Sequence, residues 1–257
     1  MAEFDTNYAR SGGLARADAI DQGLRAYMLS VYNYMAIGLA LTGLAAIGGY
    51  MLSVTNDPSA AVAQLGNGTY LTEFGRLMFI SPLKWVVVLA PLAMVFFLSF
   101  RVHKMSVAAA QATFWIYAGL VGLSLSTIFL VYTQQSITQV FFVTAASFGA
   151  LSLWGYTTGK DISGWGSFLR MGVFGIIIAM LVNFALGSPA LDFAISVIGV
   201  LVFAGLTAYD TQQIKEMYYA NDDGTVAGRK AIMGALRLYL DFINLFLMLL
   251  QLFGNRD

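Results

Sequence analysis

The sequence is short of the residues that build metal sites and disulfides. None of its 257 residues is cysteine, and His103 is the only histidine. Disulfides are therefore excluded, and a zinc site made of Cys and His ligands cannot form from one imidazole. Charge is also scarce: charged residues make up 11% of the chain, against about 25% in soluble domains. The 14 basic and 14 acidic residues balance, so nothing favours a nucleic-acid partner.

Apolar residues take the place of the missing charge. They make up 58% of the sequence, and the mean hydropathy is +0.72. Seven runs have roughly the 20 apolar residues that a membrane-spanning helix needs. These runs are Tyr27 to Val54, Trp85 to Phe100, Val107 to Tyr132, Val140 to Thr157, Phe168 to Leu186, Leu191 to Gln212 and Leu236 to Phe253. None alternates with a period of two, so the sequence predicts an all-α integral membrane bundle of seven helices.

The predicted domains are a polar N-terminal tail, residues 1–26, and a transmembrane domain, residues 27–257. We expect the tail to be retained, because the apolar run after it is too long for a signal peptide. The long connection between the first two runs is expected to hold a short interfacial helix.

Basic residues predict the orientation. With the tail in the cytoplasm, most of them lie on the cytoplasmic side: Arg10, Arg16, Arg25, Arg101, Lys104, Lys160, Arg170, Lys215, Arg229, Lys230 and Arg237. Only Arg76, Lys84 and Arg256 lie outside. This asymmetry predicts a cytoplasmic N-terminus and an external C-terminus in a cell inner membrane.

Two carboxyls are predicted at the same depth within the spans. Asp210 precedes Lys215 by five residues, and Asp241 follows Leu236 by five, so both lie about 7 Å inside the cytoplasmic boundary. Arg101 ends the second span on that side. Two carboxyls in contact cannot both ionise cheaply, so the cluster would have two states. Either both are ionised and held by Arg101, or one is protonated and the clamp is loosened. This predicts a pH-dependent latch.

The same residues have other interpretations. The two carboxyls could bind Ca²⁺, with an amide oxygen from Asn244 three residues after Asp241. Alternatively, the acids are structural: Arg237 precedes Asp241 by four residues and could form an intrahelical ion pair, and Asp210 could pair with Lys215. Spacing alone leaves these alternatives open.

Two blocks near the end of the chain carry a resemblance to a known family. AYDTQQIK (Ala208 to Lys215) is followed by LYLDFINLF (Leu238 to Phe246) and LLQLFG. In order and spacing they resemble the C-terminal signature of the Bax inhibitor-1 family, also called the transmembrane Bax-inhibitor-motif proteins, and especially its bacterial YccA-like branch. The resemblance extends through VYNYMAIGLALTGL and FRVHKMS and covers nearly the whole chain from about Tyr27.

The resemblance implies a fold and a function. The last helix would be central and wrapped by the other six, and the protein would be a pH-dependent calcium leak. Asp210 and Asp241 match the family's paired-carboxylate latch, and Arg101 matches the arginine that clamps it. One departure weakens the match: some calcium-conducting relatives carry an acid in the second span, where this sequence reads WVVVLAPLAMVFF.

The sequence therefore predicts a pH-sensitive Ca²⁺ leak channel with protons and Ca²⁺ as its ligands and no cofactor. The alternative is a non-conducting interaction protein that modulates an AAA-type membrane protease or a stress or cell-death response. No enzyme is expected, because HExxH, G-x-S-x-G and P-loop motifs are absent. An intramembrane aspartyl protease would also use two aspartates within its spans. Neither Asp210 nor Asp241 lies in the motif of those enzymes, so only the number of aspartates agrees.

Overall fold

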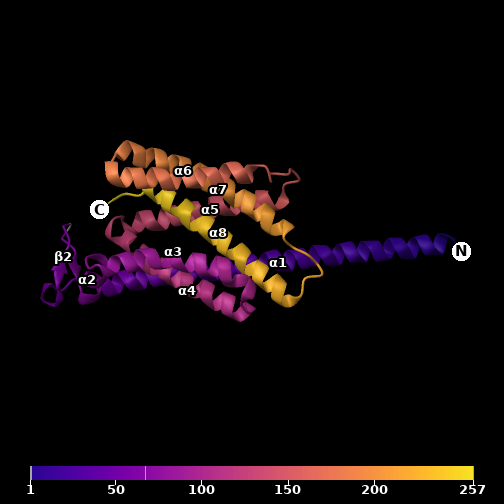
Figure 1. Cartoon of the computed structure of the whole chain (residues 1–257), viewed down its shortest axis with the longest axis horizontal. Coiled ribbons are helices and arrows are strands. Elements are labelled where there is room, and N and C mark those ends of the chain that lie inside the picture. Colours follow the sequence, from indigo (N-terminus) through magenta and orange to yellow (C-terminus); the bar gives the residue numbers. More distant parts are fainter. Residues whose placement is uncertain (1, 67, 257) are drawn as a thin grey trace.

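The computed structural model describes the backbone of residues 2–66 and 68–256, with side chains from residue 21 onward. Its helices run side by side along one axis (Figure 1). In this described part they are α1 (Ala2–Ser53), α2 (Glu73–Phe79), α3 (Leu83–Arg101), α4 (Val107–Leu125), α5 (Gln134–Thr157), α6 (Trp165–Leu186), α7 (Pro189–Glu216) and α8 (Gly224–Phe253). All but α2 are long and apolar enough to cross a membrane, which confirms the seven predicted spans.

The helix boundaries follow local capping. Side chains of Ser106, Thr133 and Ser188 accept hydrogen bonds from the first turns of α4, α5 and α7. Asp223 caps α8 in the same way, so that helix begins twelve residues before the predicted Leu236. The hydropathy pattern missed these three turns because they carry Arg229 and Lys230, which suit the bilayer boundary better than its core.

A small sheet and a short helix fill the connection between α1 and α3. The strands are β1 (Val54–Thr55), β2 (Ala63–Gln64) and β3 (Tyr70–Leu71), in the order β1-β3-β2. Both pairings are antiparallel: Val54 and Ala63 both lie opposite Leu71. The expected short helix is α2, capped by Thr72. Strands of two residues are too short to give a period that sequence reading could detect.

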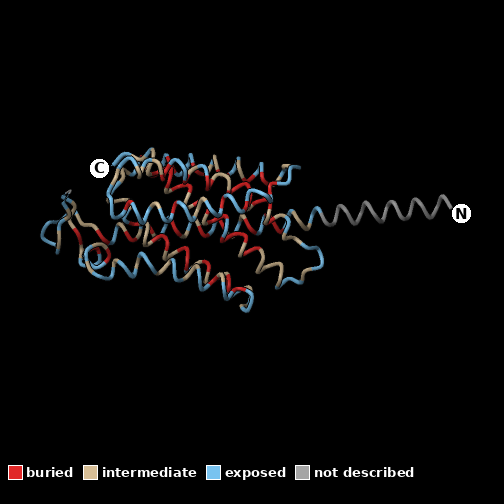
Figure 2. Tube along the Cα trace, turned by 45° about the horizontal axis from the view of Figure 1, so that its top comes forward, coloured by how far each residue is buried: buried red, intermediate tan, exposed pale blue. Residues whose placement is uncertain are grey.

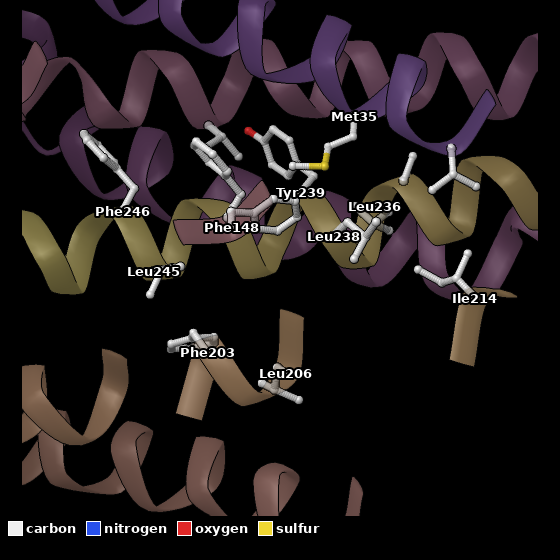
Figure 3. Close-up of a cluster of buried hydrophobic side chains, with 14 of the residues drawn as sticks. Met35, Phe148, Phe203, Leu206, Ile214, Leu236, Leu238, Tyr239, Leu245 and Phe246 are labelled. Carbon is white, nitrogen blue, oxygen red and sulfur yellow. The ribbon is translucent and has the colours of Figure 1, made fainter. Parts of the chain in front are cut away.

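Helix α8 is the most buried of the seven candidate spans. It packs against α1, α4, α5 and α7, whereas α3 packs mainly on α4 and α6 on α7. In Figure 3, buried side chains of α8 lie between Met35 of α1 on one side and Phe203 and Leu206 of α7 on the other. The prediction that all six other spans wrap the last helix is not confirmed, because α8 has four principal neighbours.

The outer surface of the bundle is apolar. Figure 2 shows exposed residues along the outward faces of the helices and buried residues along the inward faces. The exposed set includes Phe100, Phe168 and Phe184, which are 80%, 73% and 86% exposed. A surface of this kind suits lipid, as expected of an integral membrane protein. The predicted tail, residues 1–26, falls mostly on residues whose side chains lie outside the described part, so that assignment stays a prediction.

Candidate functional site: a carboxyl pair between two helices

Asp210 and Asp241 are brought together by the neighbouring helices α7 and α8. Their side chains lie within hydrogen-bonding range of each other. Asp241 is buried, with 5% of its surface exposed. Its Oδ2 atom receives no hydrogen bond from an N–H or a hydroxyl of the described residues. A hydrogen bond between two carboxyls needs a proton on one of them, so this geometry suits a pair that shares one proton.

The positive charges that act on the pair come from α8 and α6. Arg237 of α8 interacts electrostatically with both carboxyls, and Arg170 of α6 interacts with Asp210. Neither arginine forms an ion pair with them, since the salt bridges of the described residues are Glu73–Arg76 and Asp222–Lys230. The intrahelical ion pair considered for Arg237 and Asp241 is therefore absent from this structure. The pair instead lies in the field of two arginines that are not in direct contact with it.

The structure does not bring Arg101 to the pair, which corrects that part of the predicted cluster. Arg101 is exposed at the end of α3, and α3 packs mainly on α4 and α2. Residue counting gave a predicted depth for Arg101 but could not say which helices are its neighbours. Arg170 was not among the candidates from the sequence. It lies five residues after Trp165, at which α6 begins at the same end of the bundle.

Asn244 and Lys215 form hydrogen bonds with groups other than the ones considered in the sequence analysis. The Asn244 Nδ2 atom donates to the carbonyl of Leu240 at 2.8 Å, and the side chain lines a separate cavity of about 350 Å³. Lys215 donates to the carbonyl of Tyr156 at 2.9 Å and does not pair with Asp210. The described residues hold no cluster of three or more Asp, Glu, His or Cys side chains, so the carboxyls form a pair and nothing larger. A Ca²⁺ site at Asp210 and Asp241 stays a prediction.

Residues that follow Asp210 hold the end of α7 in place. The Thr211 hydroxyl lies 2.9 Å from the Ser152 hydroxyl, which lies 2.7 Å from the Tyr32 hydroxyl, so the chain of hydroxyls joins α7, α5 and α1. Gln212 donates to the carbonyl of Lys160 at 2.8 Å and accepts from the Ile162 amide at 3.0 Å. These bonds tie the α5–α6 loop to α7. Asp210 therefore lies on a fixed segment.

Fold and site together define a seven-span helical membrane protein with a carboxyl pair inside the bundle. A family model described as "Inhibitor of apoptosis-promoting Bax1" matches residues 24–257. The chain belongs to this family, the Bax inhibitor-1 family, as the resemblance indicated.

Relatives match along almost their full length. The inner membrane protein YbhL of Escherichia coli K12 is 47% identical over 246 residues, which cover 94% of this chain and 97% of YbhL. An uncharacterized protein of Caulobacter vibrioides is 44% identical over 265 residues, covering all of both chains. The uncharacterized protein RP147 of Rickettsia prowazekii is 47% identical over 236 residues, 92% of each chain.

Proposed function

We propose that this protein is a pH-responsive cation leak of the cytoplasmic membrane, that Ca²⁺ is its ion, and that Asp210 and Asp241 are its proton sensor. The observation that carries the proposal is the contact between the two carboxyls, one of them buried, inside a membrane bundle. Ionisable groups within membrane spans are costly, and they commonly serve ion or proton pathways. The location draws support from YbhL, which is named an inner membrane protein.

The sensor acts through the proton that the pair shares. With that proton in place, the two carboxyls attract each other and hold α7 against α8. Without it, two negative charges lie within a few ångströms, and they repel by about 4 kcal/mol at 4 Å in a medium of effective dielectric constant about 20. Arg237 and Arg170 offset part of this repulsion, because both act on the pair. The two protonation states therefore favour different spacings of α7 and α8.

The test is Ca²⁺ flux into liposomes that contain the purified protein and a Ca²⁺-sensitive dye, measured over a range of pH. The wild-type flux should change with pH. Asp241→Asn and Asp210→Asn should each remove that change, because an amide cannot lose the proton. Asp161→Asn is the matched control, since Asp161 lies on the exposed α5–α6 loop, where its carboxylate accepts from the Ser163 amide at 2.8 Å.

Three outcomes separate the parts of the proposal. A pH profile that is the same in Asp241→Asn and in wild type would overturn the sensor assignment. Equal fluxes of K⁺ and Ca²⁺ would overturn Ca²⁺ as the specific ion. Absence of flux at every pH, in protein that melts cooperatively, would overturn conduction itself.

A second proposal is a non-conducting interaction protein that modulates an AAA-type membrane protease. It is favoured by α3, which has no acidic residue and presents exposed apolar side chains such as Leu92, Phe96 and Phe97. Such a face suits contact with another membrane protein as well as with lipid. Recovery of a membrane protease with the full chain, its loss after deletion of residues 1–25, and no flux in liposomes would support this second function.

A further inference from the structure

A groove separates α1 from α5 at the end of the bundle that carries Arg25. The two helices do not pack against each other along their length, and a cavity of about 710 Å³ lies between them. This volume falls within the range of about 300–1,000 Å³ for ligand sites. Its walls are mostly apolar, and Leu29 and Leu153 are 52% and 61% exposed. The groove therefore opens sideways, toward the region that lipid occupies.

The groove has the length of one lipid leaflet. On α1 it is lined from Arg25 to Leu39, which is about 21 Å of helix at 1.5 Å per residue. Half of a bilayer, headgroups included, is about 20–22 Å thick. A lipid with its headgroup at Arg25 would therefore extend its acyl chains to about Leu39, near the bilayer midplane. A second cavity of about 220 Å³ also reaches Leu39 and continues between the same helices.

Positive charge gathers at the headgroup end of the groove. Arg25 lines it and forms no ion pair with any acid whose side chain the structure describes. The Lys215 Nζ atom lies 5.3 Å from the ring centroid of Tyr156, another residue of the groove wall. Farther from Arg25, the hydroxyls of Tyr32 and Ser152 are hydrogen-bonded to each other across the gap at 2.7 Å. Because they already have partners, this part of the groove does not require a polar ligand.

From this arrangement we infer that the groove between α1 and α5 binds one anionic phospholipid. Its phosphate lies at Arg25, and an acyl chain lies between α1 and α5 as far as Leu39. The inference concerns a surface that faces lipid and does not depend on conduction. It rests on the match of length, the apolar walls and, at one end, a cation that forms no ion pair with any acid whose side chain the structure describes.

Native mass spectrometry of the detergent-purified chain tests the site, with phosphatidylglycerol and phosphatidylcholine added at equal concentration. Wild type should retain one phosphatidylglycerol, with about fivefold preference over phosphatidylcholine, as expected for one basic residue at an anionic headgroup. Gly149→Trp should lower retention at least fivefold, because a side chain at Gly149 projects into the groove and meets no atom within 4 Å. Gly175→Trp is its control, on α6 and equally unobstructed.

Charge is tested separately from volume. Arg25→Gln should abolish the preference for phosphatidylglycerol, whereas Lys104→Gln, an exposed cation outside the groove, should keep it. If Gly149→Trp fails to fold, Gly149→Leu gives the same test with a smaller side chain. Unchanged retention in the folded Gly149 variant would overturn the site. Equal retention of both lipids by wild type would overturn the anionic headgroup.

Discussion

Tyr239 and Asp241 lie two residues apart on α8, and their polar groups have partners on different helices. The Tyr239 hydroxyl lies 2.6 Å from the Thr42 hydroxyl of α1, and Asp241 is in contact with Asp210 of α7. Thr42 itself lies 2.9 Å from the carbonyl of Ala118 and 3.0 Å from that of Gly38, to which its hydroxyl donates. Tyr239 is therefore the donor to Thr42, and α8 is fixed from two sides.

This donor assignment predicts unequal costs for removing the two hydroxyls. Tyr239→Phe removes one hydrogen bond and leaves no donor unpaired, so the free energy of unfolding should fall by about 0.6–1 kcal/mol. Thr42→Val leaves the Tyr239 hydroxyl buried without its acceptor and should cost about 1–3 kcal/mol. Unfolding by sodium dodecyl sulfate in mixed micelles measures both. A larger loss for Tyr239→Phe than for Thr42→Val would contradict the assignment.

At the scale of single residues, the two acids of the site could be predicted from the sequence, but the basic residues around them could not all be predicted. Asp210 and Asp241 could be predicted because depth within a span follows from residue counting, and consecutive helices are usually neighbours. The predicted clamp by Arg101 is not formed in this structure, where Arg101 has no ion pair with either acid, because counting gives depth and not the order of helices around the bundle. Arg237 was named from its spacing on the same helix, because proximity along one helix is what sequence gives directly. It acts on the two acids through its charge, without the ion pair that the spacing allowed.

Among whole elements, small residues set how closely the helices approach. A Cβ atom at Gly122 of α4 would lie 2.4 Å from the carbonyl oxygen of Thr42 on α1, whereas a Cβ at Gly119, one turn earlier, meets nothing within 4 Å. At Gly155 of α5 a Cβ would lie 2.3 Å from the carbonyl oxygen of Ala208 on α7. Glycine is required where backbone faces backbone at this distance.

The two glycines of α4 form a matched pair for experiment. Gly122→Ala should force α1 and α4 apart and lower the free energy of unfolding by about 1–3 kcal/mol, as overpacking does. Gly119→Ala should raise it by up to about 1 kcal/mol, because alanine is the better helix former. The same micelle titration reads both changes. Equal effects of the two substitutions would contradict the close contact between α1 and α4.

Hydropathy predicted the existence of the elements well and their neighbours poorly. All seven spans were found because each must cross an apolar layer of fixed thickness. The first three turns of α8 were missed because they lie where charged side chains are tolerated, and only the cap at Asp223 marks their start. That α3 packs mainly on α4, and reaches α8 chiefly through the turn that follows it, depends on side-chain fit between helices, for which one sequence holds no periodic signal.

For the whole molecule, the absence of cysteine allows its orientation to be tested with single introduced thiols. Gly66 and Gly159 are exposed, with no atom within 4 Å of an added Cβ, and the segments that hold them lie at opposite ends of the bundle (Figure 1). In intact cells, a membrane-impermeant maleimide should label Gly66→Cys and not Gly159→Cys. After permeabilisation it should label both, because the positive-inside asymmetry predicts that residue 159 faces the cytoplasm.

The opposite labelling pattern would reverse the predicted orientation and leave the fold unchanged. Labelling of both positions in intact cells would contradict the opposite placement of the two segments. The parent chain, which has no thiol, is the blank for every measurement.

The burial of α8 has a consequence for how the protein is made. Ribosomes translate α8 after the other six spans, yet it supplies the surface on which α1, α4, α5 and α7 pack. Until it enters the membrane, those earlier spans have no common partner, and Asp210 has no neighbouring carboxyl from Asp241. The surfaces of the earlier spans that later contact α8 must therefore face lipid or the insertion machinery during synthesis. Assembly is complete only when α8 packs between those spans.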